Sequence, residues 1–299
     1  MSWQSKAVER LLRIARGVQR GSDAQAMERA IQRARSRAKD PSPKVKLLRD
    51  DLVLAEAQLF GMRVFDLRLR TGGSDQHVVY YHGGSYTFDI APPHWWFLTH
   101  LARTTGARIS IAIYPLAPES AAAKTVPVAT DLAEQIIDES NAGTVTVMGD
   151  SAGGGLALAV AQQLLARGKQ PRQTVLISPW LDVSMTDPGL PAIAPLDAML
   201  NVVGLAHCGR LYAGELDTSD PLASPLYGEL DGLAPIEIYT GTHDLLNVDA
   251  HNLVERAKGR NVQVTLHEEA EMPHVHPLLP FIPEGRRARD QIVANVHSG

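Results

Sequence analysis

The chain of 299 residues is long enough for one large α/β domain with insertions or for two smaller domains, and its 44% apolar content is ordinary for a globular protein. A single cysteine, Cys208, excludes an intrachain disulfide and fits a reducing compartment, and no Cys/His pattern typical of a zinc site is present. With no run of 18 apolar residues and no signal-peptide core, the sequence predicts a cytoplasmic protein without stable membrane insertion.

The N-terminal segment, residues 1–49, is a basic appendage. It holds 13 of the 29 Lys and Arg residues and only 4 of the 33 Asp and Glu residues, in a chain with a net charge of −4. Apolar residues recur there at helical spacing in two stretches, which predicts two amphipathic helices. A membrane-surface or nucleic-acid patch is one interpretation. Because the apolar positions are rich in alanine, we favour helices that lie over the main domain, with no nucleic-acid partner.

Beyond a break at residues 41–43 (PSP), short β-rich runs alternate with helical stretches. The predicted strands are 63–69, 77–81, 108–113, 144–148, 174–178, 236–240 and 262–266, and helical segments between them include 95–105, 126–140, 152–167 and 248–258. Strands that are apolar on both faces and separated by helices indicate a mostly parallel sheet covered on each side, a doubly wound α/β domain. The alternation fails over residues 182–214, which predicts an insertion there.

The motif at residues 149–153 (GDSAG) follows one of these apolar strands and precedes an alanine-rich helix. It fits G-x-S-x-G, the strand-to-helix turn in which a serine is held in a strained conformation and in which side chains at the glycine positions would collide with their surroundings. A tight turn without chemistry is the alternative. The strand before it and the helix after it favour Ser151 as a nucleophile.

A serine nucleophile needs a base, and the base needs an orienting acid, in the chain order Ser, Asp or Glu, His. Asp244 follows the strand at 236–240 and is the predicted acid, with a helix-capping role as the alternative. The histidines that satisfy the order are His267, His274, His276 and His297. The loop Pro273-His274-Val275-His276-Pro277 is the most suitable, and spacing leaves His274 and His276 open. A metal site at this pair lacks a third ligand, so we expect no metal and no cofactor.

Donors for a developing oxyanion are expected after the strand at 77–81. The loop His82-Gly83-Gly84-Ser85 lets backbone N–H groups approach a bound oxygen, and the N–H of Ala152 completes the predicted oxyanion hole. His82 is expected to brace this loop through a hydrogen bond and not to act as a base. A glycine hairpin without a catalytic role is the alternative.

Several motifs in this order resemble the microbial hormone-sensitive-lipase-like esterases of the α/β-hydrolase fold, from about residue 60 onward. They are residues 81–86 (YHGGSY), 114–119 (YPLAPE), 149–154 (GDSAGG), 220–226 (DPLASPL), the turn at Asp244, and 272–274 (MPH). The resemblance implies a mostly parallel eight-stranded sheet flanked by helices, with a helical cap. It also implies Ser151 as nucleophile, Asp244 as acid and His274 as base, with Gly83, Gly84 or Ser85 beside Ala152 as oxyanion donors. Ser85 stands where a third glycine is commoner.

The resemblance further implies two cap elements, residues 1–49 and 182–214, around a catalytic domain formed by residues 50–181 and 215–299. The sequence therefore predicts a serine carboxylesterase for short- to medium-chain esters, with a small-molecule substrate, and leaves a homodimer open. Two other activities remain open at this point. One is an amidase or formamidase on the same residues, and the other is a non-catalytic receptor that keeps the fold.

Overall fold

The computed structural model describes residues 1–18, 24–37, 40–43, 48 and 50–297. The predicted basic appendage 1–49 therefore lies partly outside the described residues. The principal helices are α1 (Trp3–Val18), α2 (Ala24–Ser36), α4 (Pro92–Thr105), α5 (Ala122–Glu139), α6 (Ala152–Ala166), α7 (Leu190–Ile193), α8 (Val202–Ala213), α9 (Asn247–Ala257) and α10 (Pro283–His297). Short 3-10 turns are η1 (Ala142–Thr144), η2 (Pro225–Tyr227) and η3 (His276–Leu278).

One eight-stranded sheet runs through the molecule in the order β1-β2-β4-β3-β5-β6-β7-β8. Its strands are β1 (Leu52–Leu59), β2 (Met62–Leu69), β3 (His77–Tyr81), β4 (Arg108–Ile113), β5 (Val145–Asp150), β6 (Gln173–Ile177), β7 (Ile236–His243) and β8 (Val264–Pro273). Strand β2 runs antiparallel to both of its neighbours, β1 and β4, and the other neighbouring strands pair in parallel. The predicted mostly parallel sheet is confirmed. Strand β1 was not predicted, because an edge strand with half its residues exposed lacks the apolar run of a central strand.

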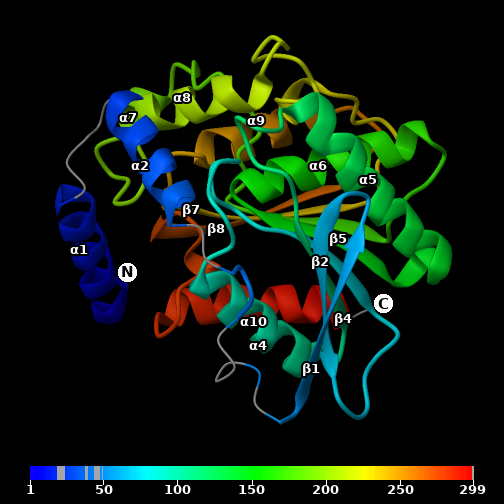
Figure 1. Cartoon of the computed structure of the whole chain (residues 1–299). Coiled ribbons are helices and arrows are strands. Elements are labelled where there is room, and N and C mark those ends of the chain that lie inside the picture. Colours follow the sequence, from blue (N-terminus) through cyan, green and yellow to red (C-terminus); the bar gives the residue numbers. More distant parts are fainter. Residues whose placement is uncertain (19–23, 38–39, 44–47, 49, 298–299) are drawn as a thin grey trace.

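Helices cover both faces of the sheet (Figure 1). Helices α4 and α10 lie on one face, and α5, α6 and α9 lie on the other. The central strands β3, β5 and β6 are buried along their whole length, as strands covered on two sides must be. The carboxyl ends of these parallel strands meet at one edge of the sheet, where the sequence motifs converge.

Strands β7 and β8 extend further than the sequence analysis predicted, to His243 and Pro273. His267 directly follows the predicted strand 262–266, and in the structure it lies inside β8. Its ring stacks on Tyr239, with 4.4 Å between the centroids, and its Nε2 lies 2.6 Å from Glu237 Oε2. The extension was not predicted because polar residues end the apolar pattern in both strands. Pairing between β7 and β8 continues past that point.

The appendage and the insertion meet above the sheet. Helix α2 packs on α8, and Glu28 Oε2 lies 3.0 Å from Nε2 of His207. Ile31 of α2 is buried in the main core, as the prediction of helices lying over the domain requires. Helix α8 in turn packs on the loop after β3, where the Tyr212 and Tyr86 rings stack with 3.5 Å between their centroids. The N-terminal end of α1 contacts α10, where the Ser2 hydroxyl donates to Glu284 Oε2 at 2.9 Å.

Candidate active site

Ser151 occupies a sharp turn between β5 and α6. Its φ is +53° and its ψ is −122°, in a region that residues with a side chain rarely occupy. Strain of this kind persists only where the surroundings enforce it, and here the Ser151 N–H donates to the Ile177 carbonyl of β6. The strained serine expected from the sequence is therefore present.

The glycines around Ser151 are required by close backbone packing. A Cβ on Gly149 would overlap the carbonyl of Gly153, and a Cβ on Gly153 would overlap the carbonyls of Tyr81 and His82. Gly153 thus lets α6 approach the end of β3, which brings the serine beside the glycine loop (residues 82–86).

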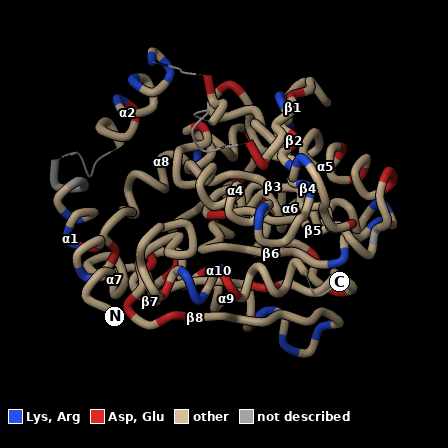
Figure 2. The backbone as a smooth tube through the Cα atoms, turned by 90° about the horizontal axis from the view of Figure 1, so that it is seen from below, with Lys and Arg blue, Asp and Glu red and all other residues tan. Residues whose placement is uncertain are grey.

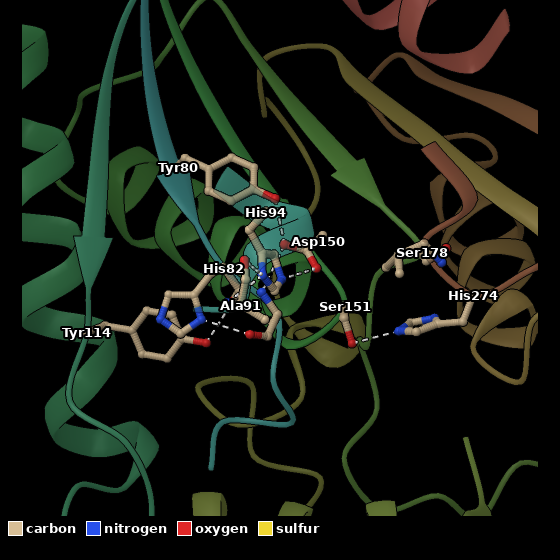
Figure 3. A network of polar contacts seen from close by, with 11 residues as sticks. Tyr80, His82, Ala91, His94, Tyr114, Asp150, Ser151, Ser178 and His274 are labelled. Carbon is tan, nitrogen blue, oxygen red and sulfur yellow. Dashed lines mark hydrogen bonds and ion pairs between the residues drawn. The ribbon is translucent and has the colours of Figure 1, made fainter. Parts of the chain in front are cut away.

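Three polar residues from distant parts of the chain form one hydrogen-bonded row (Figure 3 shows two of them, Ser151 and His274). His274 follows β8, and its Nε2 lies 3.0 Å from Ser151 Oγ. Its Nδ1 lies 2.9 Å from Oδ1 of Asp244, which follows β7. Because Nδ1 donates to a carboxylate, Nε2 is left to accept the serine proton. All three side chains are buried, so little water competes for these hydrogen bonds.

The charge of Asp244 dominates the electrostatics of His274. Burial alone would lower the pKa of His274, but the carboxylate charge and hydrogen bond of Asp244 outweigh it and raise the pKa above its ordinary value. His276, the other candidate, is buried apart from this row, and burial lowers its pKa to about 4. The described residues contain no group of three or more potential metal ligands.

Asp197, from the insertion, fastens the turn that carries Asp244. Its Oδ2 accepts the Leu245 N–H at 2.7 Å, and its Oδ1 accepts the N–H groups of Met199 and Leu200. Burial, with the Asp244 charge adding to it, raises the pKa of Asp197. Asp197 was not predicted from the sequence, because an aspartate within a proline-rich stretch carries no motif of its own.

The glycine loop lies beside the serine, with one difference from expectation. The Gly83 N–H donates to Asp150 Oδ1 at 2.9 Å, so it is already engaged. Among the described residues we find no hydrogen-bond acceptor for the Gly84 N–H, and Ala152 is the first residue of α6, whose N–H has no intrahelical partner. Ser85 adopts a φ of +52°, so it takes the left-handed conformation that a third glycine would adopt with less strain.

Asp150 is the centre of a second polar cluster that the sequence analysis did not predict (Figure 3). The Tyr80 hydroxyl donates to its Oδ1 at 2.6 Å, and Nε2 of His94 lies 3.2 Å from its Oδ2. Burial alone would raise the pKa of Asp150, but the His94 charge and the hydrogen bonds outweigh it and lower the pKa. Burial would likewise lower the pKa of His94, and Asp150 raises it instead. Each of the two groups therefore favours the charged form of the other.

His82 braces the glycine loop. Its Nδ1 donates to the Gly83 carbonyl at 2.8 Å, its own carbonyl accepts the Tyr114 hydroxyl at 2.6 Å, and the two rings stack. Burial lowers the pKa of His82 to about 4, so the ring is neutral at physiological pH. This agrees with the predicted bracing role.

Comparison with known proteins agrees with this architecture. Residues 78–278 match the family described as alpha/beta hydrolase fold. An acetyl-hydrolase of Streptomyces hygroscopicus is 35% identical over 214 residues, which cover 71% of this chain and 72% of the relative. A triacylglycerol lipase of Mycobacterium tuberculosis is 39% identical over 176 residues, or 57% of this chain, and the match spans only 35% of the lipase.

Solved structures give the same result. The crystal structure of an esterase from the bacterial hormone-sensitive lipase family is 30% identical, with a TM-score of 0.79, and the match covers 91% of this chain and 97% of that one. A hormone-sensitive lipase from a metagenome library is 25% identical, with a TM-score of 0.79 and coverage of 92% and 98%.

The fold, the strained serine and the family match define the class: the chain belongs to the α/β-hydrolase fold family. Within that family it is a carboxylic ester hydrolase of the hormone-sensitive-lipase-like type.

Proposed function

We propose that the protein is a serine carboxylesterase that hydrolyses short- to medium-chain esters through Ser151, His274 and Asp244. The observation that carries the proposal is the continuous hydrogen-bonded row from buried Asp244 through His274 to the strained Ser151. A nucleophile, a base and an orienting acid in contact are the parts that acyl transfer by serine requires.

In the proposed reaction, Ser151 Oγ attacks the ester carbonyl carbon while Nε2 of His274 takes the hydroxyl proton. The resulting imidazolium, stabilised by the Asp244 carboxylate, returns that proton to the leaving alkoxide as the C–O bond breaks. An acyl-enzyme on Ser151 remains. A water molecule, deprotonated by the same Nε2, then attacks the acyl carbon and releases the acid, and Ser151 regains its proton.

The backbone N–H groups of Gly84 and Ala152 are proposed to stabilise the negative charge on the carbonyl oxygen. Neither N–H group donates a hydrogen bond to a described residue. Gly83, also predicted as a donor, would have to share its N–H with Asp150. We therefore assign Gly83 mainly to holding the loop. Donors fixed in place before the reaction stabilise such charge without reorganisation.

The acyl chain is proposed to lie under a cap formed by residues 1–49 and 182–214, over a catalytic domain of residues 50–181 and 215–299. The stacking of Tyr212 on Tyr86 supports this, because it places α8 directly against the glycine loop. A cap over the site would limit the size of the acyl group, and the name of the Streptomyces acetyl-hydrolase also suggests a small one.

A chain-length series of p-nitrophenyl esters tests the proposal, with Ser151→Ala as control. We expect the best turnover with acetate to octanoate esters, labelling of Ser151 by a fluorophosphonate, and a loss of several orders of magnitude in the variant. Activity only on long-chain emulsions would contradict the substrate range. Faster hydrolysis of a matched amide would favour the amidase, and absence of both turnover and labelling would favour the receptor.

A further inference from the structure

The outward face of α1 carries a row of large apolar side chains that nothing in the described chain covers. Trp3, Leu11 and Ile14 are 75%, 65% and 55% exposed, and Ala7 between them is also exposed. Their spacing of four, four and three residues puts all four on one face of the helix, here called the outer stripe. Single exposed apolar residues are ordinary in proteins, but a continuous row of them marks an interaction surface.

The opposite face of α1 is anchored, so the outer stripe points away from the domain by construction. The buried Ser5 hydroxyl donates to Glu284 Oε2 of α10 at 2.6 Å. Two turns further on, Arg13 donates to the Leu196 carbonyl of the insertion at 2.6 Å. These contacts fix the rotation of the helix about its axis.

Cations flank the outer stripe. Lys6 and Arg10 are exposed on the neighbouring strip of α1, and neither forms an ion pair with a described residue. Helix α2 adds exposed Arg29 and Arg33, and Figure 2 shows Lys and Arg recurring along both helices. An apolar row beside positive charge is the pattern of helices that lie in the plane of an anionic lipid surface.

We propose that the outer stripe of α1 docks the protein peripherally on anionic lipid surfaces. A second copy of this chain is a poorer occupant, because it would bring the same cations of both copies together. Lipid phosphates supply the opposite charge, and acyl chains accept Trp3, Leu11 and Ile14. None of the described helices is long and apolar enough to cross a membrane, so the contact is confined to the surface.

The alanine-rich stripes predict helices that lie over the domain. Helix α1 is anchored on the domain by one face, while its bulkiest apolar residues face outward. Because α1 is part of the proposed cap, docking would hold the cap against the phase in which apolar esters collect.

Co-sedimentation with phosphatidylglycerol/phosphatidylcholine vesicles, compared with pure phosphatidylcholine vesicles, tests the proposal on the full chain. We expect binding to the anionic vesicles only, weakened at high salt. The double variant Leu11→Ser/Ile14→Ser and the variant Lys6→Glu/Arg10→Glu should each lose at least tenfold in partition. The matched control Phe60→Ser/Tyr227→Ser, which removes exposed apolar residues elsewhere, should bind as the unsubstituted protein does.

Tryptophan fluorescence gives a second measurement, because Trp3 is the exposed tryptophan and its emission should shift to the blue on anionic vesicles. Hydrolysis of a dissolved short ester by the unsubstituted protein, measured without vesicles, tests the esterase proposal separately from docking. Failure to bind anionic vesicles at low salt would overturn the inference. So would binding that the stripe substitutions leave intact, or an oligomer of the purified protein that these substitutions convert to a monomer.

Discussion

The Gly83 N–H donates to Asp150 Oδ1 over 2.9 Å, which joins the glycine loop to the residue directly before the proposed nucleophile. The same carboxylate accepts the Tyr80 hydroxyl and faces His94. The loop position therefore depends on one buried carboxyl oxygen, and not on the turn of the loop alone.

The substitution Asp150→Ala is expected to lower kcat about 10- to 100-fold with little change in KM, because the Gly84 N–H would no longer be held toward the oxyanion. Asp150→Asn should lose less than about 10-fold, since the amide oxygen still accepts from Gly83 and Tyr80. Steady-state kinetics with p-nitrophenyl acetate measure both. A variant Asp150→Ala with reduced thermal stability but normal kcat would show that the carboxylate only supports the fold.

The rate is expected to depend on the protonation of His274. The base must be neutral, and Asp244 raises its pKa, so kcat/KM should rise with pH along an acid limb centred above about 6.5. Asp244→Asn should lower kcat by up to about 10⁴-fold and move this limb to lower pH, because the charge that raises the pKa is gone. A pH–rate profile is the measurement, and Asp217→Asn, an exposed carboxylate, is the control. An unmoved limb would argue against the Asp244 assignment.

Two glycines that each follow an alanine should differ strongly in their tolerance of an alanine substitution. Gly153→Ala places a methyl group on the carbonyls of Tyr81 and His82 and should destabilise the fold by about 3 kcal/mol, with loss of activity. Gly143→Ala meets only the Asn141 side chain at 3.3 Å and should stay within about 0.5 kcal/mol of the unsubstituted protein. Denaturant unfolding compares the two. Equal stabilities would mean that α6 does not approach β3 as closely as described.

Because of the buried Asp249 carboxyl, the free energy of unfolding is expected to fall at high pH. Its Oδ2 accepts the N–H groups of Leu181 and Asp182, yet burial raises its pKa to about 8 from an ordinary value of 3.8. The folded state thus holds a proton that the unfolded chain has released, and stability falls as pH rises between about 4 and 8.

Asp249→Asn removes this dependence on pH, because an amide side chain does not titrate. Its oxygen can still accept both N–H groups. The stability of the variant relative to the unsubstituted protein should grow by more than about 1.4 kcal/mol between pH 5 and 8.5, the equivalent of one pKa unit. Unfolding in urea at both values measures it. A difference that stays constant with pH would show that the Asp249 carboxyl is ionised in the folded protein.

Features that depend on a short local pattern could be predicted from the sequence. The turn at Ser151 requires glycines beside it, so residues 149–153 predict that turn. The alternation of strands and helices predicts the mostly parallel sheet. Contacts between distant segments left no such pattern. His94 and Asp150 are 56 positions apart and meet only when α4 packs on the sheet. The direction of the Gly83 N–H and the outward rotation of α1 likewise depend on tertiary packing, which no spacing rule encodes.

The separation of Ser151 from His274 by 123 positions also bears on biosynthesis. A chain leaving the ribosome carries Ser151 well before it carries β8, and in the folded structure His274 follows β8, which is paired with β7. Under the proposed mechanism, a nascent chain is therefore inert toward esters until β8 and His274 have been translated and β8 has paired with β7.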